Sequence, residues 1–171
     1  IAKDIIELRL DKPADFTYQA GQFVQFRVPQ GDATVLRSYS LASHPGDDYL
    51  LFCVKLLTDG LFSTYASSVL PGFELEWQGP RGRFIHTAPA SPLLFVATGA
   101  GLAPVYGIIR DDLHNKKNTE AMQLLFGVRS EEDIFWLSEL ETLQNQFSNF
   151  SYSITLSRPG SSWAGHQGRV T

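Results

Sequence analysis

Residues 36–41 bring together side chains suited to holding a phosphate and a flat ring system. They read Leu-Arg-Ser-Tyr-Ser-Leu, so a guanidinium, a phenol and two hydroxyls follow one another between apolar residues. Arginine can bind phosphate through two parallel hydrogen bonds, and a tyrosine ring can stack on a planar group. Because side chains alternate along a strand, Arg37 and Tyr39 would share one face and Ser38 and Ser40 the other. Taken alone, the string also fits a polar edge strand with a solvated arginine.

The stretch 98–104, Thr-Gly-Ala-Gly-Leu-Ala-Pro, is a second candidate for phosphate chemistry. Glycines let a backbone approach a pyrophosphate closely, and proline fits the first turn of a helix. The stretch is not the G-x-G-x-x-G fingerprint, because a proline stands where the third glycine would be. The candidate residues are Thr98, Gly99, Ala100, Gly101, Leu102 and Pro104.

Two further places offer groups that bind phosphate. Gly60, Leu61, Phe62 and Ser63 open an expected helix, whose first backbone N–H groups can bind an anion; Ser63 could equally be a plain N-cap. Arg129 follows one expected strand, and Ser157 and Arg158 follow another. Nucleotides bind at such carboxyl ends in open α/β sheets.

The first half of the chain predicts an antiparallel β-barrel. Short strand-like runs alternate with turns, and a short helix is expected at 61–69. Phe84 is expected to enter the barrel core after a glycine-rich turn at 79–83, where Arg81 and Arg83 are either solvated or add charge toward a partner. The expected strands are 5–10, 21–28, 35–41, 49–57, 73–77 and 84–86.

The second half predicts a parallel α/β sheet, because strand and helix patterns alternate. A linker is expected at 88–92. Strands are expected at 93–97, 122–128 and 150–156, the first as a continuously apolar, buried parallel strand. Helices are expected at 102–114 and 131–147, the latter from the spacing of Ile134, Leu137, Leu140 and Leu143. The predicted domains are therefore 1–90 and 91–171.

Composition excludes several classes of function. The net charge of −4 over 171 residues gives no general footprint for nucleic acid. The single cysteine, Cys53, excludes an internal disulfide and a cysteine-rich metal site, and it favours a reducing compartment, which we take to be the cytoplasm. The four histidines lack metal-ligand spacing, and no apolar run approaches the roughly 18 residues of a membrane span.

Four motifs in order resemble the ferredoxin–NADP reductase superfamily of FAD- and nicotinamide-dependent electron-transfer flavoproteins. They cover nearly the whole chain, and they are Arg-Ser-Tyr-Ser at 37–40, Asp-Gly-Leu-Phe-Ser at 59–63, Gly-Pro-Arg-Gly-Arg-Phe at 79–84 and the stretch 98–104. The resemblance implies a Greek-key β-barrel that binds FAD, followed by a nicotinamide-nucleotide-binding α/β domain.

The resemblance also implies roles around the flavin. Arg37 would hold the pyrophosphate, Tyr39 would pack on the isoalloxazine, and the Ser40 hydroxyl would lie near flavin N5, which makes Tyr39 and Ser40 the catalytic candidates. Ser38 would contribute its backbone only, and residues 60–63 would bind the pyrophosphate. Val54 and Lys55 would run past the ribityl and adenine, although a solvated role for Lys55 is nearly as well supported.

For the nicotinamide nucleotide, the resemblance implies that residues 99–104 hold the dinucleotide together with Arg129, Ser157 and Arg158. Ala100 departs from the usual threonine, which removes a hydroxyl near the nicotinamide–flavin contact. Arg169 stands where an aromatic residue is common. Two arginines and a serine slightly favour NADPH, whereas Ser-Arg-Pro followed by Trp163 is also similar to NADH-using members.

The implied activity is electron transfer from NADPH or NADH through FAD to an acceptor. Ferredoxin, an iron–sulfur protein, an oxygenase, free flavin and ferric iron all remain open as acceptors, as does the oligomeric state. The alternative is a non-catalytic flavin-binding electron-transfer or regulatory subunit. A module without flavin is a third hypothesis, which the intact string at 37–40 disfavours.

The family's later Cys-Gly pair and terminal aromatic are absent from the sequence up to Thr171. Its first strand is also absent ahead of Ile1. We therefore expect a fragment with an incomplete nucleotide domain, whose short sheet could expose an apolar edge.

Overall fold

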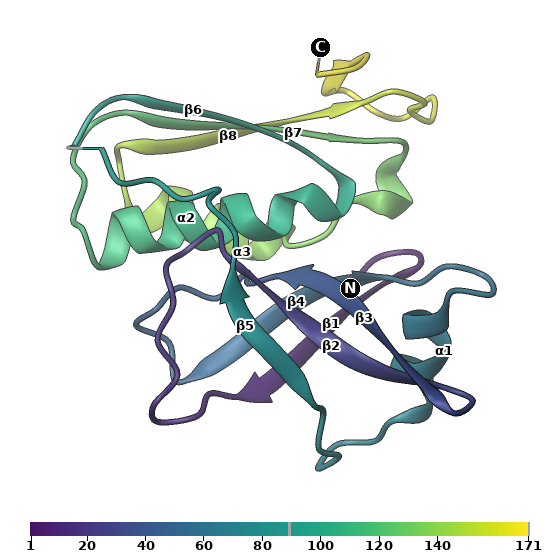
Figure 1. Ribbon diagram of the computed structural model, residues 1–171. Helices are drawn as coiled ribbons and strands as arrows, with labels where there is room; N and C mark the ends of the chain where they lie inside the picture. Colours follow the sequence, from purple (N-terminus) through teal and green to yellow (C-terminus); the bar gives the residue numbers. More distant parts are fainter. Residues whose placement is uncertain (89, 171) are drawn as a thin grey trace.

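The chain folds into two halves around two clusters of buried hydrophobic side chains (Figure 1). One cluster lies within the first half, and the other joins the second half to residues of the first. The computed structural model describes residues 1–88 and 90–170; Pro89, in the expected linker, and Thr171 lie outside them. We call residues 1–88 the β-half and residues 90–170 the α/β-half.

In the β-half, the described strands form antiparallel sheets. Strand β1 (Ile5–Asp11) pairs with β4 (Tyr49–Lys55), and β2 (Phe23–Gln30) lies between β3 (Ala33–Ser40) and β5 (Trp77–Arg81). Alternate residues of β2, namely Val24, Phe26 and Val28, are fully buried, as expected for a strand with one face on the core. Helix α1 (Leu61–Ser68) packs Phe62 and Ala66 against the same core.

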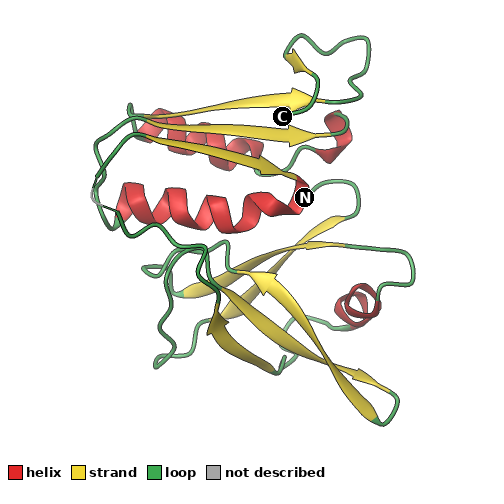
Figure 2. Cartoon of the chain, turned by 45° about the horizontal axis from the view of Figure 1, so that its top comes forward, coloured by secondary structure: helices red, strands yellow, loops and turns green. Residues whose placement is uncertain are grey.

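The α/β-half is a parallel sheet in the order β6 (Leu93–Thr98), β7 (Met122–Val128), β8 (Phe150–Leu156) and β9 (His166–Gln167). Helices α2 (Leu102–His114) and α3 (Leu137–Gln146) both lie on the side of the sheet that faces the β-half (Figures 1 and 2). Short 3₁₀ turns, η1 (Gly99–Gly101) and η2 (Glu131–Asp133), follow β6 and β7. None of the described helices is long and apolar enough to cross a membrane.

The other face of this sheet carries no described helix, which corrects one expectation. Residues 93–97 were predicted as a buried strand, yet the side chains of Leu94 and Val96 are 62% and 50% exposed. Both point to the uncovered face, because side chains of β6 alternate between the helices and the open side. The apolar run therefore marks a strand covered on one face only.

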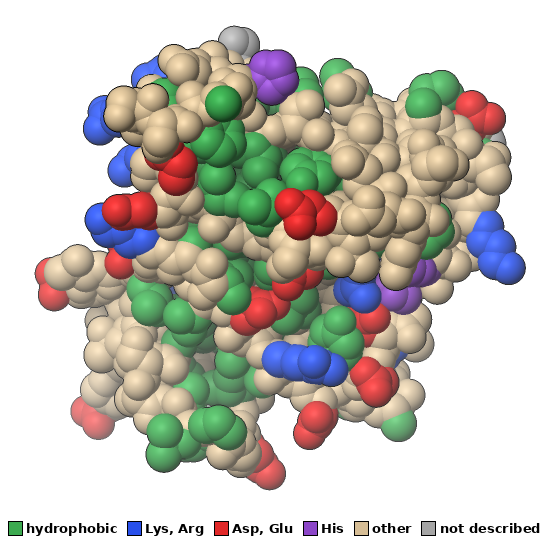
Figure 3. All heavy atoms as spheres, turned by 180° about the vertical axis from the view of Figure 1, so that it is seen from behind, with side chains coloured by type: hydrophobic (Ala, Val, Ile, Leu, Met, Phe, Trp, Pro, Cys, Tyr) green, Lys and Arg blue, Asp and Glu red, His purple; other side chains and the backbone are tan. Residues whose placement is uncertain are grey.

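The two halves meet along α2 through both apolar and polar contacts. Ala42 and Leu51 of the β-half belong to the same buried cluster as the apolar side chains of α2. Arg110 donates two hydrogen bonds to Asp47, at 2.6 and 2.9 Å, and the rings of His44 and His114 stack at 5.6 Å. Figure 3 shows acidic, basic and histidine side chains near the boundary between the halves. Charged pairs therefore help to fix how the two halves sit against each other.

Most predicted elements agree with the structure within two residues, and both fold classes are confirmed. The region after α1 differs: residues 73–76 are not a strand, residues 77–81 form β5 rather than part of a turn, and 84–86 form no strand. Phe84, expected in the core, is 59% exposed. The helix predicted at 131–147 is interrupted before α3, because Trp136 adopts left-handed backbone angles.

Candidate functional site

Two cavities adjoin at the boundary between the halves. We name both cavities after the ligands that the sequence resemblance implies. The first, the flavin-side cavity, has a volume of about 290 Å³ and is lined by Ser38, Tyr39, Ser40, Cys53, Lys55, Ala100 and Ala103. The second, of about 310 Å³, lies at the carboxyl ends of β6, β7 and β8, and we call it the nucleotide-side cavity. Lys55 and Ala100 line both, so the two cavities meet at these residues.

Strand β3 forms one wall of the flavin-side cavity. Tyr39 lies opposite Val24 of β2, and its ring centroid is 4.4 Å from that of Phe62 and 6.0 Å from that of Phe26. Burial raises the pKa of the Tyr39 phenol, and the nearby charge of Arg37 offsets part of this rise. Tyr39 is therefore a fixed, neutral ring with a hydroxyl that can donate at neutral pH.

Arg37 and Ser38 extend from the same strand on opposite faces. Ser38 Oγ accepts a hydrogen bond from Gln25 Nε2 at 3.3 Å. Arg37 is exposed, and its Nη1 donates to the carbonyl of Leu36 at 3.0 Å. The other N–H groups of this guanidinium have no partner among the described residues, so Arg37 has the donors that a phosphate would need.

The start of helix α1 offers backbone N–H groups rather than a side-chain cap. Gly60 is the N-cap, so the alternative of Ser63 as N-cap is wrong. The buried Ser63 Oγ instead accepts the N–H of Leu57 at 2.8 Å. A Cβ at Gly60 would lie 2.7 Å from this oxygen, so the turn requires glycine. The first N–H groups of the helix have no intrahelical acceptor and remain available to an anion.

Cys53, on the floor of the flavin-side cavity, is an inert thiol at neutral pH. Burial, reinforced by the charge of Glu7 and opposed by that of the chain's amino terminus, raises its pKa to about 12. Because the thiolate is the reactive form, Cys53 contributes shape rather than nucleophilic chemistry.

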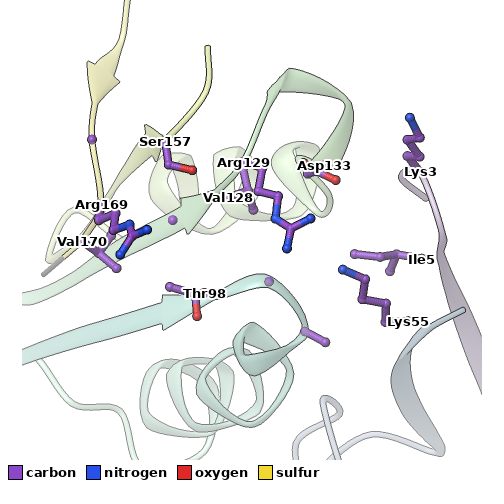
Figure 4. A pocket seen from close by; sticks show the side chains of 14 residues that line it. Lys3, Ile5, Lys55, Thr98, Val128, Arg129, Asp133, Ser157, Arg169 and Val170 are labelled. Atoms are coloured by element: carbon purple, nitrogen blue, oxygen red, sulfur yellow. The ribbon is translucent and has the colours of Figure 1, made fainter. Parts of the chain in front are cut away.

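The nucleotide-side cavity is rich in positive charge. Lys3 and Lys55 reach it from the β-half, and Arg129 and Arg169 reach it from the α/β-half. Figure 4 shows Arg129 and Lys55 pointing toward the same space from opposite sides. Asp133, the one carboxylate among the lining residues, accepts hydrogen bonds from the backbone N–H and hydroxyl of Ser130 at 3.1 and 3.0 Å. The cavity therefore suits a ligand with several negative charges.

Glycines of η1 leave the space that a dinucleotide backbone needs. Gly99 has a φ of +50°, and neither Gly99 nor Gly101 has an atom within 4 Å of where a Cβ would stand. Side chains there would fill open space beside the start of α2. The glycines and the cations together fit a pyrophosphate, while the Tyr39 ring and the Arg37 donors fit a flavin nucleotide.

The structure brings together part of the predicted set. Ser38, Tyr39, Ser40, Lys55 and Ala100 line the flavin-side cavity. Thr98, Gly99, Arg129 and Ser157 join Lys55 and Ala100 around the nucleotide-side cavity. Several predicted residues line neither cavity. Among them, Val54, Phe62 and Leu102 have side chains buried in the hydrophobic cores. The others are Arg37, Gly60, Leu61, Ser63, Gly101, Pro104 and Arg158.

Sequence reasoning missed lining residues that only tertiary structure delivers. Lys3 and Ile5 come from the other half of the molecule, and no local pattern marks them. Cys53 and Ala103 line the flavin-side cavity as small side chains. Asp133 was read as part of a helix, although a serine followed three residues later by a carboxylate is the signal of a helix start.

Comparison with known protein families shows which family the chain belongs to. Residues 1–86 match the family described as "Oxidoreductase FAD-binding domain", and residues 95–171 match "Oxidoreductase NAD-binding domain". The chain belongs to the ferredoxin–NADP reductase superfamily of oxidoreductases. It carries the superfamily's FAD-binding and NAD-binding domains.

Individual relatives of this superfamily member are longer than the chain. Ferredoxin–NADP reductase B of Sorangium cellulosum is 39% identical over 91% of this chain and 64% of its own length. Methane monooxygenase component C of Methylosinus trichosporium is 37% identical over 80% of this chain and 40% of its own length. The chain thus spans less than two thirds of these relatives.

A solved structure agrees with the fold over nearly the whole chain. The cytochrome P450 reductase GcoB of Amycolatopsis superposes on this chain with a TM-score of 0.86 and 27% sequence identity. The superposition covers 98% of this chain and 51% of the GcoB chain. In the described residues, no group of histidine, cysteine and carboxylate side chains is arranged to hold a metal ion.

Proposed function

We propose that this chain passes electrons from NADPH or NADH through FAD to an acceptor. The observation that carries the proposal is the meeting of the two cavities at Lys55 and Ala100. A flavin ring in one cavity and a nicotinamide in the other would be neighbours there. When bound, FAD supplies the chemistry that links a hydride donor to an electron acceptor.

On the flavin side, we assign binding to the β-half. Tyr39 offers a ring held by Phe62, and Ser40 offers a hydroxyl beside it. Arg37 and the backbone of Gly60, Leu61, Phe62 and Ser63 would hold the phosphates. Lys55 and the backbone of Val54 would follow the remainder of the flavin nucleotide.

On the nucleotide side, Gly99, Gly101 and the start of α2 at Leu102 and Pro104 would hold the pyrophosphate. Arg129, Ser157 and Arg158 would hold the adenosine end. The small side chain of Ala100 leaves the meeting point open to ring contact. The surplus of cations favours NADPH over NADH, because NADPH carries an additional phosphate.

We further propose a division into domains at 1–90 and 91–171, and a location in the cytoplasm, in keeping with a single buried thiol. The acceptor proposed is ferredoxin, another iron–sulfur protein or an oxygenase component. The names of the relatives from Sorangium cellulosum and Methylosinus trichosporium support this class.

Steady-state oxidation of NADPH and NADH by the FAD-loaded chain, with ferricyanide as acceptor, tests the proposal. We expect turnover that needs FAD and is faster with NADPH at low concentration. Bound FAD without turnover would contradict the proposal and support a non-catalytic flavin carrier, for which the absence of a hydroxyl at Ala100 is the structural argument.

A further inference from the structure

The corner between β7 and α3, residues 129–136, carries two lining residues into the nucleotide-side cavity. Arg129 stands at its start and Asp133 lies within η2. The opposite wall includes Lys3, Ile5 and Lys55 of the β-half. The shape of this cavity therefore depends on how the corner is held against β1 and against the loop that follows β8.

Trp136 fixes the corner to the β-half. Its indole Nε1 donates to Glu7 Oε1 of β1 at 3.0 Å, and its ring stacks on Tyr106 at 4.8 Å. Trp136 is 3% exposed and has a φ of +56°, a left-handed conformation that a bulky residue rarely adopts. Such strain persists only where surrounding contacts over-determine it. Here Tyr106 holds the ring from within the α/β-half, and Glu7 holds it across the boundary between the halves.

Glu131 fixes the corner to the loop after β8. The backbone N–H of Gly160 donates to both carboxylate oxygens, at 3.0 and 3.2 Å. A Cβ at Gly160 would lie 3.1 Å from Glu131 Oε1, so the carboxylate sits tightly against this glycine. The same loop begins with Ser157 and Arg158, and the N–H of Arg158 donates to the carbonyl of Arg129 at 2.7 Å. The carboxylate thus closes a short bridge between two walls of the site.

We propose that the corner acts as a brace, with Glu131 and Trp136 as positioning residues for the proposed hydride transfer. The proposal rests on the function given above. Glu131 sets the loop that receives the adenosine end of the nucleotide. The Trp136–Glu7 contact sets how the nucleotide-side cavity is aligned with the flavin-side cavity where the two meet, since Cys53, directly opposite Glu7 in the β1–β4 pair, lines the latter.

If the corner acts as a brace, nucleotide binding and the rate of flavin reduction should respond to different variants of the FAD-loaded chain. Glu131→Ala should weaken binding of NADP⁺ about fivefold through loss of a charge-assisted hydrogen bond, with flavin reduction at saturating NADPH nearly unchanged. Glu7→Ala should slow flavin reduction at saturating NADPH on the order of tenfold, because small misplacements of reacting groups are costly. Titration of the flavin difference spectrum and anaerobic stopped-flow absorbance measure the two quantities.

Conservative and matched variants separate positioning from structural roles. Glu131→Gln and Glu7→Gln keep an acceptor oxygen and should restore most of each loss. Glu141→Ala and Asp11→Ala remove exposed carboxylates of α3 and β1 whose side chains have no hydrogen-bond partner among the described residues, and they should behave like wild type. If Glu131→Ala and Glu7→Ala match these controls, the brace is refuted.

The outcome for the wild-type chain separates this inference from the proposed function. The wild-type chain could bind NADP⁺ while its flavin is reduced by neither NADPH nor NADH, which would refute the proposed function. If Glu131→Ala still lowered the affinity for NADP⁺ in that case, the brace at Glu131 would be retained. A wild-type chain that binds neither NADP⁺ nor NAD⁺ overturns both.

Discussion

At the scale of single residues, Arg37 makes the most direct prediction, because its exposed guanidinium has one hydrogen bond within the described part of the chain, to the carbonyl of Leu36. Arg37→Ala should raise the dissociation constant of FAD roughly 10- to 100-fold, since hydrogen bonds to charged groups contribute about 1.5–3 kcal/mol. Fluorescence titration of FAD into the apoprotein measures this. Arg27→Ala removes an exposed arginine from the neighbouring strand as a control, and equal affinities in the two variants would argue against the assigned role.

The sequence predicted correctly which side chains share a face where a single strand determines this. The period of a strand placed Arg37 and Tyr39 on one face of β3, and the pairing of these residues with Phe26 and Val24 of β2 agrees. The hydroxyl of Ser63 could not be placed in the same way, because its partner is the N–H of Leu57 in a turn that no pattern specifies.

At the scale of elements, Gly107 shows how closely α2 approaches the β-half. A Cβ there would lie 3.0 Å from the carbonyl oxygen of Leu41 and 3.1 Å from that of Ser43. Alanine favours a helix over glycine by about 1 kcal/mol, but overpacking against fixed backbone costs about 1–3 kcal/mol. We therefore expect Gly107→Ala to lower the free energy of unfolding.

Chemical denaturation measures this loss. Gly101→Ala is the matched control, because it has a φ outside the left-handed range and open space around its Cβ position. It should leave stability unchanged. A Gly107→Ala variant more stable than wild type would show that helix propensity outweighs the contact.

The same scale shows why some elements escaped prediction. Phe73, Leu75 and Trp77 alternate like a strand, yet β2 pairs with residues 77–81 instead. Register is set by the partner strand rather than by alternation alone. Likewise, the spacing from Ile134 to Leu143 predicts one helix, but Phe135 and Trp136 enter the core through a break before α3.

At the scale of the whole molecule, the half-buried ion pair of Asp47 and Arg110 joins the halves. Burial alone would raise the pKa of Asp47, but hydrogen bonds from His44 and Arg110, with their charges, lower it from 3.8 to about 2. A carboxyl with a lowered pKa in the folded state stabilises at neutral pH. That stability, on the order of 2 kcal/mol, is lost as pH falls through the window between these two values.

Thermal unfolding of wild type and Asp47→Asn between pH 7 and pH 2 tests this contribution. The variant should be less stable at pH 7, because Arg110 loses its partner, and its stability should fall less between pH 4 and pH 2. Asp48→Asn, an exposed neighbour, should keep the wild-type dependence. Identical slopes for wild type and Asp47→Asn would exclude Asp47 as the source.

The most direct test of the account is the visible spectrum of the FAD-loaded chain during anaerobic addition of NADH and then, in a separate sample, NADPH. We expect the flavin absorption bands to bleach, and to do so at a lower concentration of NADPH than of NADH. A chain that binds FAD but bleaches with neither nucleotide would contradict the claim that the two cavities bring nicotinamide and flavin together.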